Sequence, residues 1–252
     1  MTKARQQNSW LAMKPFMFPS QKWQDAIDDA KGVLRLLELR KPSRILDLPC
    51  GLGRHSVILA QEGHKVTGVD LSPDFLEEAR CRSKAAEVEV EWRQGDMKNF
   101  CLANSFDAAL NLYTSFGYFK DPADDLQVLK NFFSSLKPNG KLLMDLMSRD
   151  IFVKKFEGTV RKEQTDGSLL LSEHTFDEQG SWLENKWSLI SKGNHIEANM
   201  GLRLYTRAEL CALLSQVGFI SLYIYGDFDG RSYDDMATRL VIVAKKPEII
   251  ST

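Results

Sequence analysis

The feature that most limits what this chain can fold into is an alternation of strand-like and helix-like segments between residues 22 and 150. Helical patterns occupy residues 21–40, 54–62 and 124–136, and Ser72-Pro73 starts one more helix. Short apolar runs occupy residues 44–48, 66–69, 89–93, 106–112 and 141–147. Parallel strands need a long crossover connection, usually a helix, so this alternation indicates a parallel sheet. The sequence therefore predicts an α/β fold with a doubly wound sheet.

The pattern changes after Asp150. Residues 159–205 carry turn signals at 166–167, 178–180 and 192–194 between strand-like runs, which is typical of an antiparallel meander. Thr206 then caps a helix, and strand-like runs at 219–225 and 239–245 follow. We therefore expect one domain over residues 1–252, made of an N-terminal lid and helix (1–43), a core (44–150), a β insert (159–205), and a closing helix and hairpin (206–246).

Composition excludes several classes of protein. Apolar residues make up 43% and charged residues 27%, as in a soluble globular chain. The 33 Lys and Arg residues nearly balance the 34 Asp and Glu residues, so the chain lacks the basic excess of a nucleic-acid or membrane-surface binder. It has no apolar run of membrane-spanning length and no signal-peptide core. Its four cysteines are far apart, which fits a reducing compartment, so we expect a cytoplasmic protein without a metal site. From the charge balance and the lack of a long apolar run, we expect no nucleic-acid partner and no membrane partner.

Three strand ends carry glycines or an acid in the order expected of a nucleotide-like ligand site. Gly51-Leu52-Gly53 joins the first strand to a helix, whose N-terminus offers free N–H groups and a positive dipole. Asp70 ends the second strand, where a carboxylate can accept hydrogen bonds from a ribose. Asp96 follows the third strand, where it can accept from an adenine amino group. Each feature alone also fits an ordinary turn or helix start, but together they predict an adenosine site.

On these residues the chain resembles the class I S-adenosylmethionine-dependent methyltransferases. The matching segments are Leu46-Asp47-Leu48-Pro49-Cys50-Gly51-Leu52-Gly53, Gly68-Val69-Asp70-Leu71-Ser72, Gln94-Gly95-Asp96-Met97, residues 106–112 and residues 136–141. The resemblance implies a seven-stranded, mostly parallel sheet whose last strand is antiparallel, with the β insert as a cap. It also implies S-adenosylmethionine as the methyl donor and S-adenosylhomocysteine as the product.

The resemblance also assigns cofactor-binding residues. Gly51 and Gly53 would surround the methionine moiety, Asp70 would hold the ribose hydroxyls, and Asp96 with Met97 would contact adenine. The full set implied is Asp47, Pro49, Cys50, Gly51, Gly53, Arg54, Asp70, Leu71, Gly95, Asp96, Met97, Asn111, Leu112, Phe18 and Trp23. Pro49 departs from the Gly or Ala of many relatives and lacks an N–H. Arg54 pairs either with the cofactor carboxylate or with solvent or an aspartate.

The acceptor side is predicted from the aromatic segment after the fourth strand. Aromatic faces suit a sulfonium or an ammonium group. The tyrosines of this segment, which carry hydroxyls, are site candidates, whereas Phe116 and Phe119 fit a core better. The expected substrate contacts are Tyr113, Ser115, Phe116, Tyr118, Arg203, Tyr205 and Arg231. Residues 14–23 form either a lid over the cofactor or a hydrophobic staple to the first helix. Trp182, Trp187, His174 and His195 of the insert either cap the acceptor pocket or form a satellite core.

We expect in-line methyl transfer to a small molecule, because a near-neutral chain lacks the electrostatic attraction that dominates nucleic-acid binding. Positioning supplies much of the catalysis, and an optional general base is sought among Tyr113, Tyr118 and His174. Two alternatives stay open. One is an NAD(P)-dependent Rossmann oxidoreductase, although Ser56 stands where its third glycine belongs. The other is a non-catalytic protein that binds S-adenosylmethionine.

Overall fold

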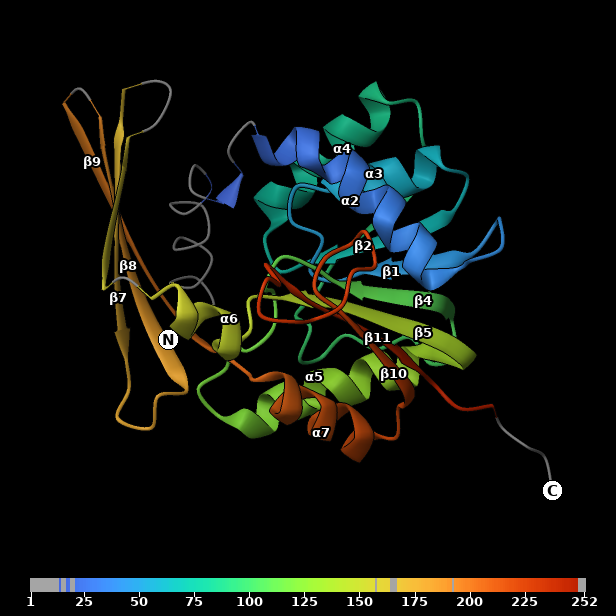
Figure 1. The fold of residues 1–252 in the computed structure, drawn as a ribbon. Helices are drawn as coiled ribbons and strands as arrows, with labels where there is room; N and C mark the ends of the chain where they lie inside the picture. Colours follow the sequence, from blue (N-terminus) through green and yellow to red (C-terminus); the bar gives the residue numbers. More distant parts are fainter. Residues whose placement is uncertain are drawn as a thin grey trace.

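The computed structural model describes Lys14, Met17, Phe18 and residues 21–156, 158–163, 167–191 and 193–248. Figure 1 shows an α/β core with a second, long sheet standing beside it. The elements in chain order are α2 (Gln21–Leu37), β1 (Arg44–Asp47), α3 (Arg54–Gln61), β2 (Lys65–Asp70), α4 (Pro73–Ala85), β3 (Val90–Gln94), β4 (Phe106–Asn111), α5 (Pro122–Ser135), β5 (Leu136–Leu146), α6 (Arg149–Lys154), β6 (Thr159–Glu163), β7 (Leu169–Phe176), β8 (Trp182–Ser191), β9 (Asn194–Arg203), α7 (Arg207–Val217), β10 (Ile220–Tyr225) and β11 (Leu240–Lys245).

The core sheet has seven strands in the order β10-β11-β5-β4-β1-β2-β3. β1 to β5 pair in parallel, whereas β11 pairs antiparallel with both β5 and β10. β1 lies between β2 and β4. The chain continues from β1 to β2 and β3 on one side, and then crosses to β4 and β5 on the other side. Open α/β sheets bind ligands at such a switch point. The predicted fold class is confirmed, including the antiparallel last strand and the separate antiparallel sheet.

Two hydrophobic cores lie on the two faces of the sheet because successive strand residues point to opposite sides. On β1, Ile45 packs with Ala30 and Leu37 of α2. Its neighbour Leu46 packs with Val128 and other residues of α5 on the opposite face. In Figure 1, α2, α3 and α4 cover one face, and α5 and α7 cover the other. Full burial of each such side chain contributes roughly 1.5–3 kcal/mol.

Several predicted helix ends are confirmed. Ser72 accepts a hydrogen bond from Phe75 N and Pro73 occupies the first turn of α4. Thr206 forms a capping box with Glu209, in which each side chain bonds the backbone N–H of the other. Gly218 ends α7 with a φ of 109°. Such caps satisfy N–H and C=O groups that have no partner inside a helix.

Most boundaries differ from the prediction by a residue or two, and three of the differences have a clear local cause or pairing. The first helix ends at Leu37 rather than residue 40, because Glu38 takes a left-handed φ of 49°. Helix α5, predicted to start at residue 124, begins at Pro122, where Asp121 caps it by accepting from Ala123 N. The turn at residues 137–140 lies within β5, because Phe106 already pairs with Leu136 before the register shifts.

The insert is a four-stranded antiparallel sheet in the order β6-β7-β8-β9. The sequence indicated a meander here but did not separate β6 from the rest. The outer face is polar: Lys186 Nζ lies 3.8 Å from a Glu173 oxygen and 3.5 Å from a Glu197 oxygen. The alternate residues of β8, Leu183, Asn185 and Trp187, face the core and line a cavity. The insert therefore presents one charged face to solvent and one mainly apolar face to the core.

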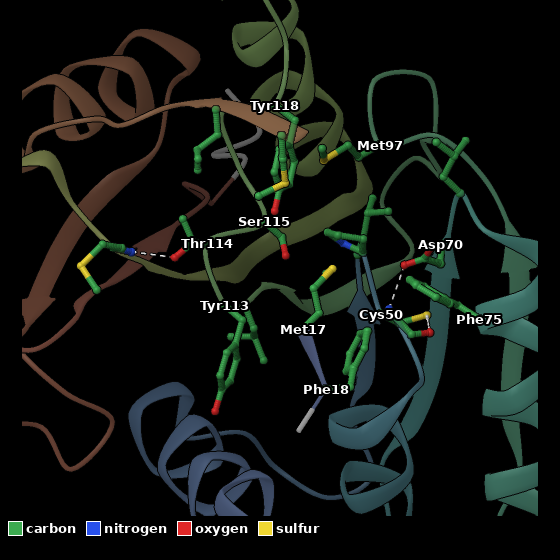
Figure 2. Close-up of a pocket in the computed structure, with 18 of the residues that line it drawn as sticks. Met17, Phe18, Cys50, Asp70, Phe75, Met97, Tyr113, Thr114, Ser115 and Tyr118 are labelled. Atoms are coloured by element: carbon green, nitrogen blue, oxygen red, sulfur yellow. Dashed lines mark hydrogen bonds between the residues drawn. The ribbon is translucent and has the colours of Figure 1, made fainter. Parts of the chain in front are cut away.

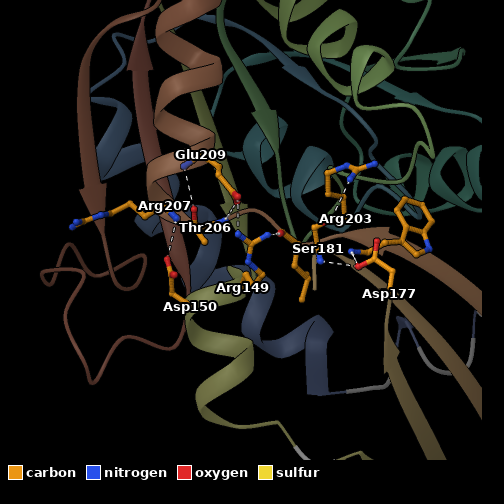
Figure 3. Close-up of polar contacts among 10 residues, drawn as sticks. Arg149, Asp150, Asp177, Ser181, Arg203, Thr206, Arg207 and Glu209 are labelled. Carbon is orange, nitrogen blue, oxygen red and sulfur yellow. Dashed lines mark hydrogen bonds and ion pairs between the residues drawn. The ribbon is translucent and has the colours of Figure 1, made fainter. Parts of the chain in front are cut away.

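Polar contacts at α6 and α7, drawn in Figure 3, join the insert to the core. α6 was not predicted. Arg149 at its start pairs with Glu209 at 2.6 Å and donates to the Leu204 carbonyl at 3.2 Å. The Arg207 N–H donates to Asp150 at 3.0 Å. These bonds fix both ends of the insert beside the carboxyl edge of the core sheet.

Neither a membrane-spanning helix nor a metal-binding cluster occurs in the part of the chain that the structure describes. No described helix combines the length and the apolar character needed to cross a bilayer. No group of three or more His, Cys, Asp or Glu side chains within the described ranges is arranged to hold a metal ion.

Candidate active site

A cavity of about 380 Å³ lies between the carboxyl ends of β1, β2 and β4 and the inner face of the insert. Figure 2 shows side chains from the loops after these strands converging on it, together with Met17 and Phe18 from the N-terminal segment. Small-molecule sites typically measure about 300–1,000 Å³. The cavity therefore has the size and the position expected of a ligand site in this fold.

The loop after β1 forms one wall of the cavity. Cys50 N donates to the Val69 carbonyl at 2.9 Å, and Gly51 N donates to Asp70 Oδ2 at 2.8 Å. Gly51 has a φ of 54°, and a Cβ there would lie 3.0 Å from Phe18 Cζ. Glycine is needed because the loop turns through a left-handed conformation beneath the Phe18 ring. The Gly51 backbone and the Phe18 ring therefore lie close together in the cavity wall, with no side chain between them.

Gly53, also predicted to contact the cofactor, is not among the residues that line the cavity, and its surroundings show a packing role. It precedes α3 with a φ of 74°, and a Cβ would lie 2.4 Å from Trp92 Cη2 and 3.0 Å from Ala79 Cβ. The packing of Trp92 behind the loop, together with the left-handed turn, explains why a glycine is required here.

Asp70 lies at the end of β2, in the cavity wall, and is 7% exposed. Besides Gly51 N, its carboxylate accepts from Ser72 N at 2.9 Å. Burial raises the pKa of Asp70 to about 6, and the backbone hydrogen bonds oppose this rise. At neutral pH the group is therefore an ionised acceptor, held by two N–H donors.

The loop after β3 continues the same wall with Gly95, Asp96 and Met97. Asp96 Oδ1 accepts from Lys98 N at 3.0 Å. Asn131 Nδ2 of α5 donates to the Met97 carbonyl at 3.0 Å. Asp96 and Met97 therefore lie in the same cavity wall as Asp70, and hydrogen bonds hold the loop that carries them.

Three cations surround the ring of Tyr113. The ring centroid lies 3.9 Å from Arg54 Cζ, 4.7 Å from Arg239 Cζ and 5.1 Å from Lys22 Nζ. Arg239 pairs with Asp145 at 2.7 Å. Arg54 is only 6% exposed, and its Nη1 has no hydrogen-bond partner among the described residues. Because Arg54 and Lys22 both line the cavity, an anionic group of a ligand could satisfy them.

Burial shifts the ionisation of several groups in this wall. It lowers the pKa of Lys22 to about 8, and the neighbouring Arg54 charge lowers it further. Burial raises the pKa of Asp47 to about 7, opposed by a hydrogen bond from Ser56. Burial lowers the pKa of His55 to about 4, so this side chain is neutral at pH 7. Perturbed groups gathered in one cavity are typical of functional sites.

The far end of the cavity is formed by the insert. Leu183, Leu202 and Leu204 form a small core with Tyr118 and Phe152 against it. Burial raises the pKa of Tyr118 far above its usual value, and the negative charge of Asp70 adds to this effect. Tyr118 therefore lies between the insert and the wall formed by Gly51, Asp70 and Asp96, which we call the Asp70 wall. The Asp70 wall and the inner face of the insert are the two ends of one cavity.

Most predicted site residues lie in the cavity wall. For the cofactor these are Asp47, Pro49, Cys50, Gly51, Arg54, Asp70, Leu71, Gly95, Asp96, Met97, Leu112 and Phe18, and for the acceptor Tyr113, Ser115, Tyr118 and His174. Besides Gly53, the predicted residues that lie outside it are Trp23, Asn111, Phe116, Arg203, Tyr205 and Arg231.

Three of these have partners in the core. The Trp23 ring lies 3.7 Å from Arg82 Cζ of α4. Asn111 Nδ2 donates to the Leu48 carbonyl at 3.0 Å, which fixes the first loop from behind. Phe116 is 1% exposed and is a core residue, which was the favoured interpretation of its position.

The other three have charged or polar partners away from the cavity. The Tyr205 hydroxyl donates to Asp125 at 2.7 Å. Arg203 Nη2 donates to the Lys120 carbonyl at 2.8 Å. Arg231 pairs with Asp229 at 2.8 Å on the surface. These residues are used in local structure, so the expected anion-binding role in the acceptor site is not supported.

Sequence reasoning missed several wall residues, among them Lys22, His55, Phe75, Thr114, Met147, Phe152, Leu183, Asn185 and Met200. Lys22 lies within the predicted lid segment 14–23 and near the start of an amphipathic helix, but nothing in the local pattern distinguishes it from its neighbours. Asn185 alternates with Leu183 and Trp187 on one face of β8, so strand periodicity was the signal that could have grouped them.

Comparisons with known proteins agree with this geometry. Residues 45–140 match the model of a methyltransferase domain. A glycine/sarcosine N-methyltransferase of Halorhodospira halochloris is 28% identical over 249 residues, which cover 89% of this chain and 86% of that protein. Among solved structures, an S-adenosylmethionine-dependent methyltransferase from Clostridium acetobutylicum ATCC 824 superimposes with a TM-score of 0.79 at 17% identity, covering 95% of this chain and 98% of that one. An S-adenosylmethionine-bound amino pentose methyltransferase from Micromonospora echinaspora gives a TM-score of 0.69 at 24% identity, covering 89% and 91%.

The matched domain spans the Gly51 loop, Asp70 and Asp96, so the sequence match and the cavity wall coincide. The structural neighbours share the fold over 95% and 89% of this chain. The chain therefore contains a methyltransferase domain at residues 45–140, and over most of its length it is similar to S-adenosylmethionine-dependent methyltransferases in sequence and fold.

Proposed function

We propose that this enzyme methylates a small molecule that lies in the cavity between the Asp70 wall and the insert. The observation that carries the proposal is the continuity of this cavity, which runs from Gly51, Asp70 and Asp96 to Leu183 and Asn185 on the insert. A methyl donor bound at the Asp70 end and a methyl acceptor bound at the insert end would meet inside this cavity. The insert covers the site, which favours a small acceptor over a polymer.

The residues at the Asp70 end of the cavity fit S-adenosylmethionine. The ionised Asp70 suits the two ribose hydroxyls, Asp96 suits the adenine amino group, and Gly51 presents backbone without a side chain in the same wall. Arg54 has a buried Nη1 without a partner among the described residues, and Lys22 lies on the same wall. We assign both cations to the cofactor carboxylate, because a buried guanidinium is stabilised by an anion.

When bound, S-adenosylmethionine supplies a methyl group activated by its sulfonium sulfur. The protein's contribution is to align the two reactants and exclude water, which can lower the barrier by several kcal/mol. Tyr118 and the apolar residues of the insert would exclude water at the point where the two ends of the cavity join. The relatives named above act on glycine or sarcosine and on an amino pentose, which supports a small acceptor for this chain as well.

Two linked experiments test this function. Isothermal titration calorimetry should detect S-adenosylmethionine binding at one site per chain, with no heat from NADH. Incubation with S-adenosylmethionine carrying a trideuteromethyl group and a cellular metabolite extract should then give a small molecule heavier by that group. Binding of NADH instead of S-adenosylmethionine would support the oxidoreductase alternative and overturn the proposal.

Cofactor affinity should pass through a maximum between about pH 6 and pH 8. Asp70, with a pKa of about 6, becomes protonated as the pH falls and loses its capacity to accept from both ribose hydroxyls. Asp47, with a pKa of about 7, acts in the same direction. Lys22, with a pKa of about 8, loses its charge as the pH rises and attracts the carboxylate less. Calorimetry from pH 5 to 9 checks this, and an affinity that is flat over that range would contradict it.

Replacing Arg54 by methionine should weaken S-adenosylmethionine binding by roughly 10- to 100-fold, the value of one charge-assisted hydrogen bond. 5′-Methylthioadenosine lacks the amino-acid portion, so its affinity should not change. Arg80→Met, on the exposed side of α4, is the matched control. Equal loss for both ligands would show that Arg54 supports the loop rather than the carboxylate.

A further inference from the structure

The acceptor end of the cavity contains one polar pair in an apolar surround. Its wall from α6 and the insert consists of Phe152, Leu183, Trp187, Met200, Leu202 and Leu204, with His174 and Asn185 among them. His174 on β7 lies directly opposite Asn185 on β8. Asn185 is 5% exposed, and burial of an amide costs free energy unless it is hydrogen bonded. Hydrophobic packing alone therefore does not account for His174 and Asn185 in this wall.

Asn185 fixes the orientation of the His174 ring. The Nδ1 atom of His174 and the Oδ1 atom of Asn185 are 2.6 Å apart. Because an amide oxygen only accepts, the shared hydrogen belongs to Nδ1, and in the neutral ring this leaves Nε2 as the acceptor atom. The Phe152 ring meets the imidazole edge-on, at 5.5 Å between centroids and 88° between planes. Among the described residues, Nε2 has no side-chain hydrogen-bond partner.

We infer that His174 Nε2 accepts a proton from the methyl acceptor, that Asn185 positions it, and that the acceptor has a mainly apolar body carrying one hydroxyl or amine hydrogen. This inference rests on the proposed function. As the acceptor atom bonds to the methyl carbon, the sulfur–carbon bond breaks and its electron pair stays on sulfur. The hydrogen of the acceptor passes as a proton to Nε2, so the positive charge moves from sulfur to the imidazolium.

The two tyrosines of the cavity are poorer proton acceptors than His174. The Tyr113 hydroxyl donates to Asp29, and burial raises the Tyr113 pKa to about 12. Burial raises the pKa of Tyr118 further. Both hydroxyls therefore stay protonated at neutral pH. The wall that α6 and the described insert residues contribute has no carboxylate, which fits an uncharged acceptor body.

The tautomer of His174 tests the positioning role without a known acceptor. In long-range ¹H–¹⁵N spectra of the ¹⁵N-histidine-labelled complex with S-adenosylhomocysteine, His174 should show a protonated Nδ1 and an unprotonated Nε2. Spectra of a His174→Gln variant assign the signal among the four histidines. Asn185→Leu should shift the tautomer toward protonated Nε2, whereas Asn185→Asp, which keeps an acceptor oxygen, should preserve it. Asn199→Leu, on the exposed face of β9, should change nothing.

A matched pair of probes tests the recognition of a protic group. Phenol added to the same complex should shift the His174 Nε2 resonance by donating to it, whereas toluene, which has the same body without the hydroxyl, should shift only the neighbouring apolar residues. A protonated Nε2 in the wild-type complex, or an equal response to phenol and toluene, would overturn the inference. So would the absence of any response to either probe.

Turnover of the acceptor found in the labelled-methyl experiment gives the final arm. His174→Gln should lower the turnover number about 100-fold or more while S-adenosylmethionine affinity stays unchanged. Asn185→Asp should restore most of the rate that Asn185→Leu loses. Full turnover in His174→Gln would end the inference but leave the proposed function intact, whereas failure of the wild type to bind S-adenosylmethionine would remove the proposed function itself.

Discussion

An Asp70→Ala variant should bind S-adenosylmethionine at least about 100-fold more weakly than the wild type. Asp70 is the buried acceptor at the end of β2, and two backbone N–H groups already orient it toward the cavity. Each hydrogen bond from a ribose hydroxyl to an ionised carboxylate contributes about 1.5–3 kcal/mol. Loss of two such bonds corresponds to a decrease of at least two powers of ten in affinity. Isothermal titration calorimetry measures this directly.

The control for Asp70 is the nearby Asp74, an exposed acid in the first turn of α4. Asp74→Ala should leave cofactor affinity unchanged. Asp70→Asn keeps the shape of the side chain and one acceptor oxygen, so its loss should be intermediate. If Asp70→Ala binds as tightly as Asp74→Ala, the ribose is held elsewhere, and the assignment of this wall to adenosine is wrong.

A Gly117→Ala variant should lose at least about 3 kcal/mol of unfolding free energy, well above the roughly 1–2 kcal/mol of a left-handed alanine alone. Gly117 has a φ of 98°, and a Cβ there would lie 2.3 Å from the Arg203 carbonyl oxygen. The Arg203 N–H also donates to the Gly117 carbonyl at 2.7 Å. Since both contacts involve backbone, neither side can move without separating the core loop from β9. Urea unfolding measures the change.

Gly180→Ala provides the comparison. Gly180 also has a positive φ, of 66°, but a Cβ there would meet nothing within 4 Å. This variant should therefore show only the conformational penalty. Equal destabilisation of the two variants would mean that the Gly117–Arg203 contact does not join the insert to the core.

The core was predictable because its signals are local. Apolar runs with helical patterns between them identify strands buried on both faces, and Ser72-Pro73 and Thr206 have the chemistry of helix starts. Where the prediction was wrong, a single backbone conformation decided the outcome, as at Glu38, whose left-handed φ ends the first helix early. β6 and α6 were missed because both are short, β6 is mostly exposed and α6 buries only Ile151, so they leave little hydrophobic pattern.

The two ends of the site differ in how far they could be predicted. Asp70 and Asp96 follow strands whose carboxyl ends must meet at one sheet edge, so sequence order alone brings them together. The acceptor end depends on strand register within the insert, and a shift by one residue would move Asn185 to the opposite face. Arg203 and Tyr205 were assigned to the acceptor because of their chemistry, but the buried Asp125 beside them uses that chemistry in the structure.

A crystal structure of the complex with S-adenosylhomocysteine tests the central claim most directly. The ribose hydroxyls should lie on Asp70, adenine beside Asp96 and Met97, and the carboxylate on Arg54 and Lys22. The sulfur should then face the part of the cavity that His174 and Asn185 line. A sulfur that faces away from the insert, or a product bound outside this cavity, would contradict the account.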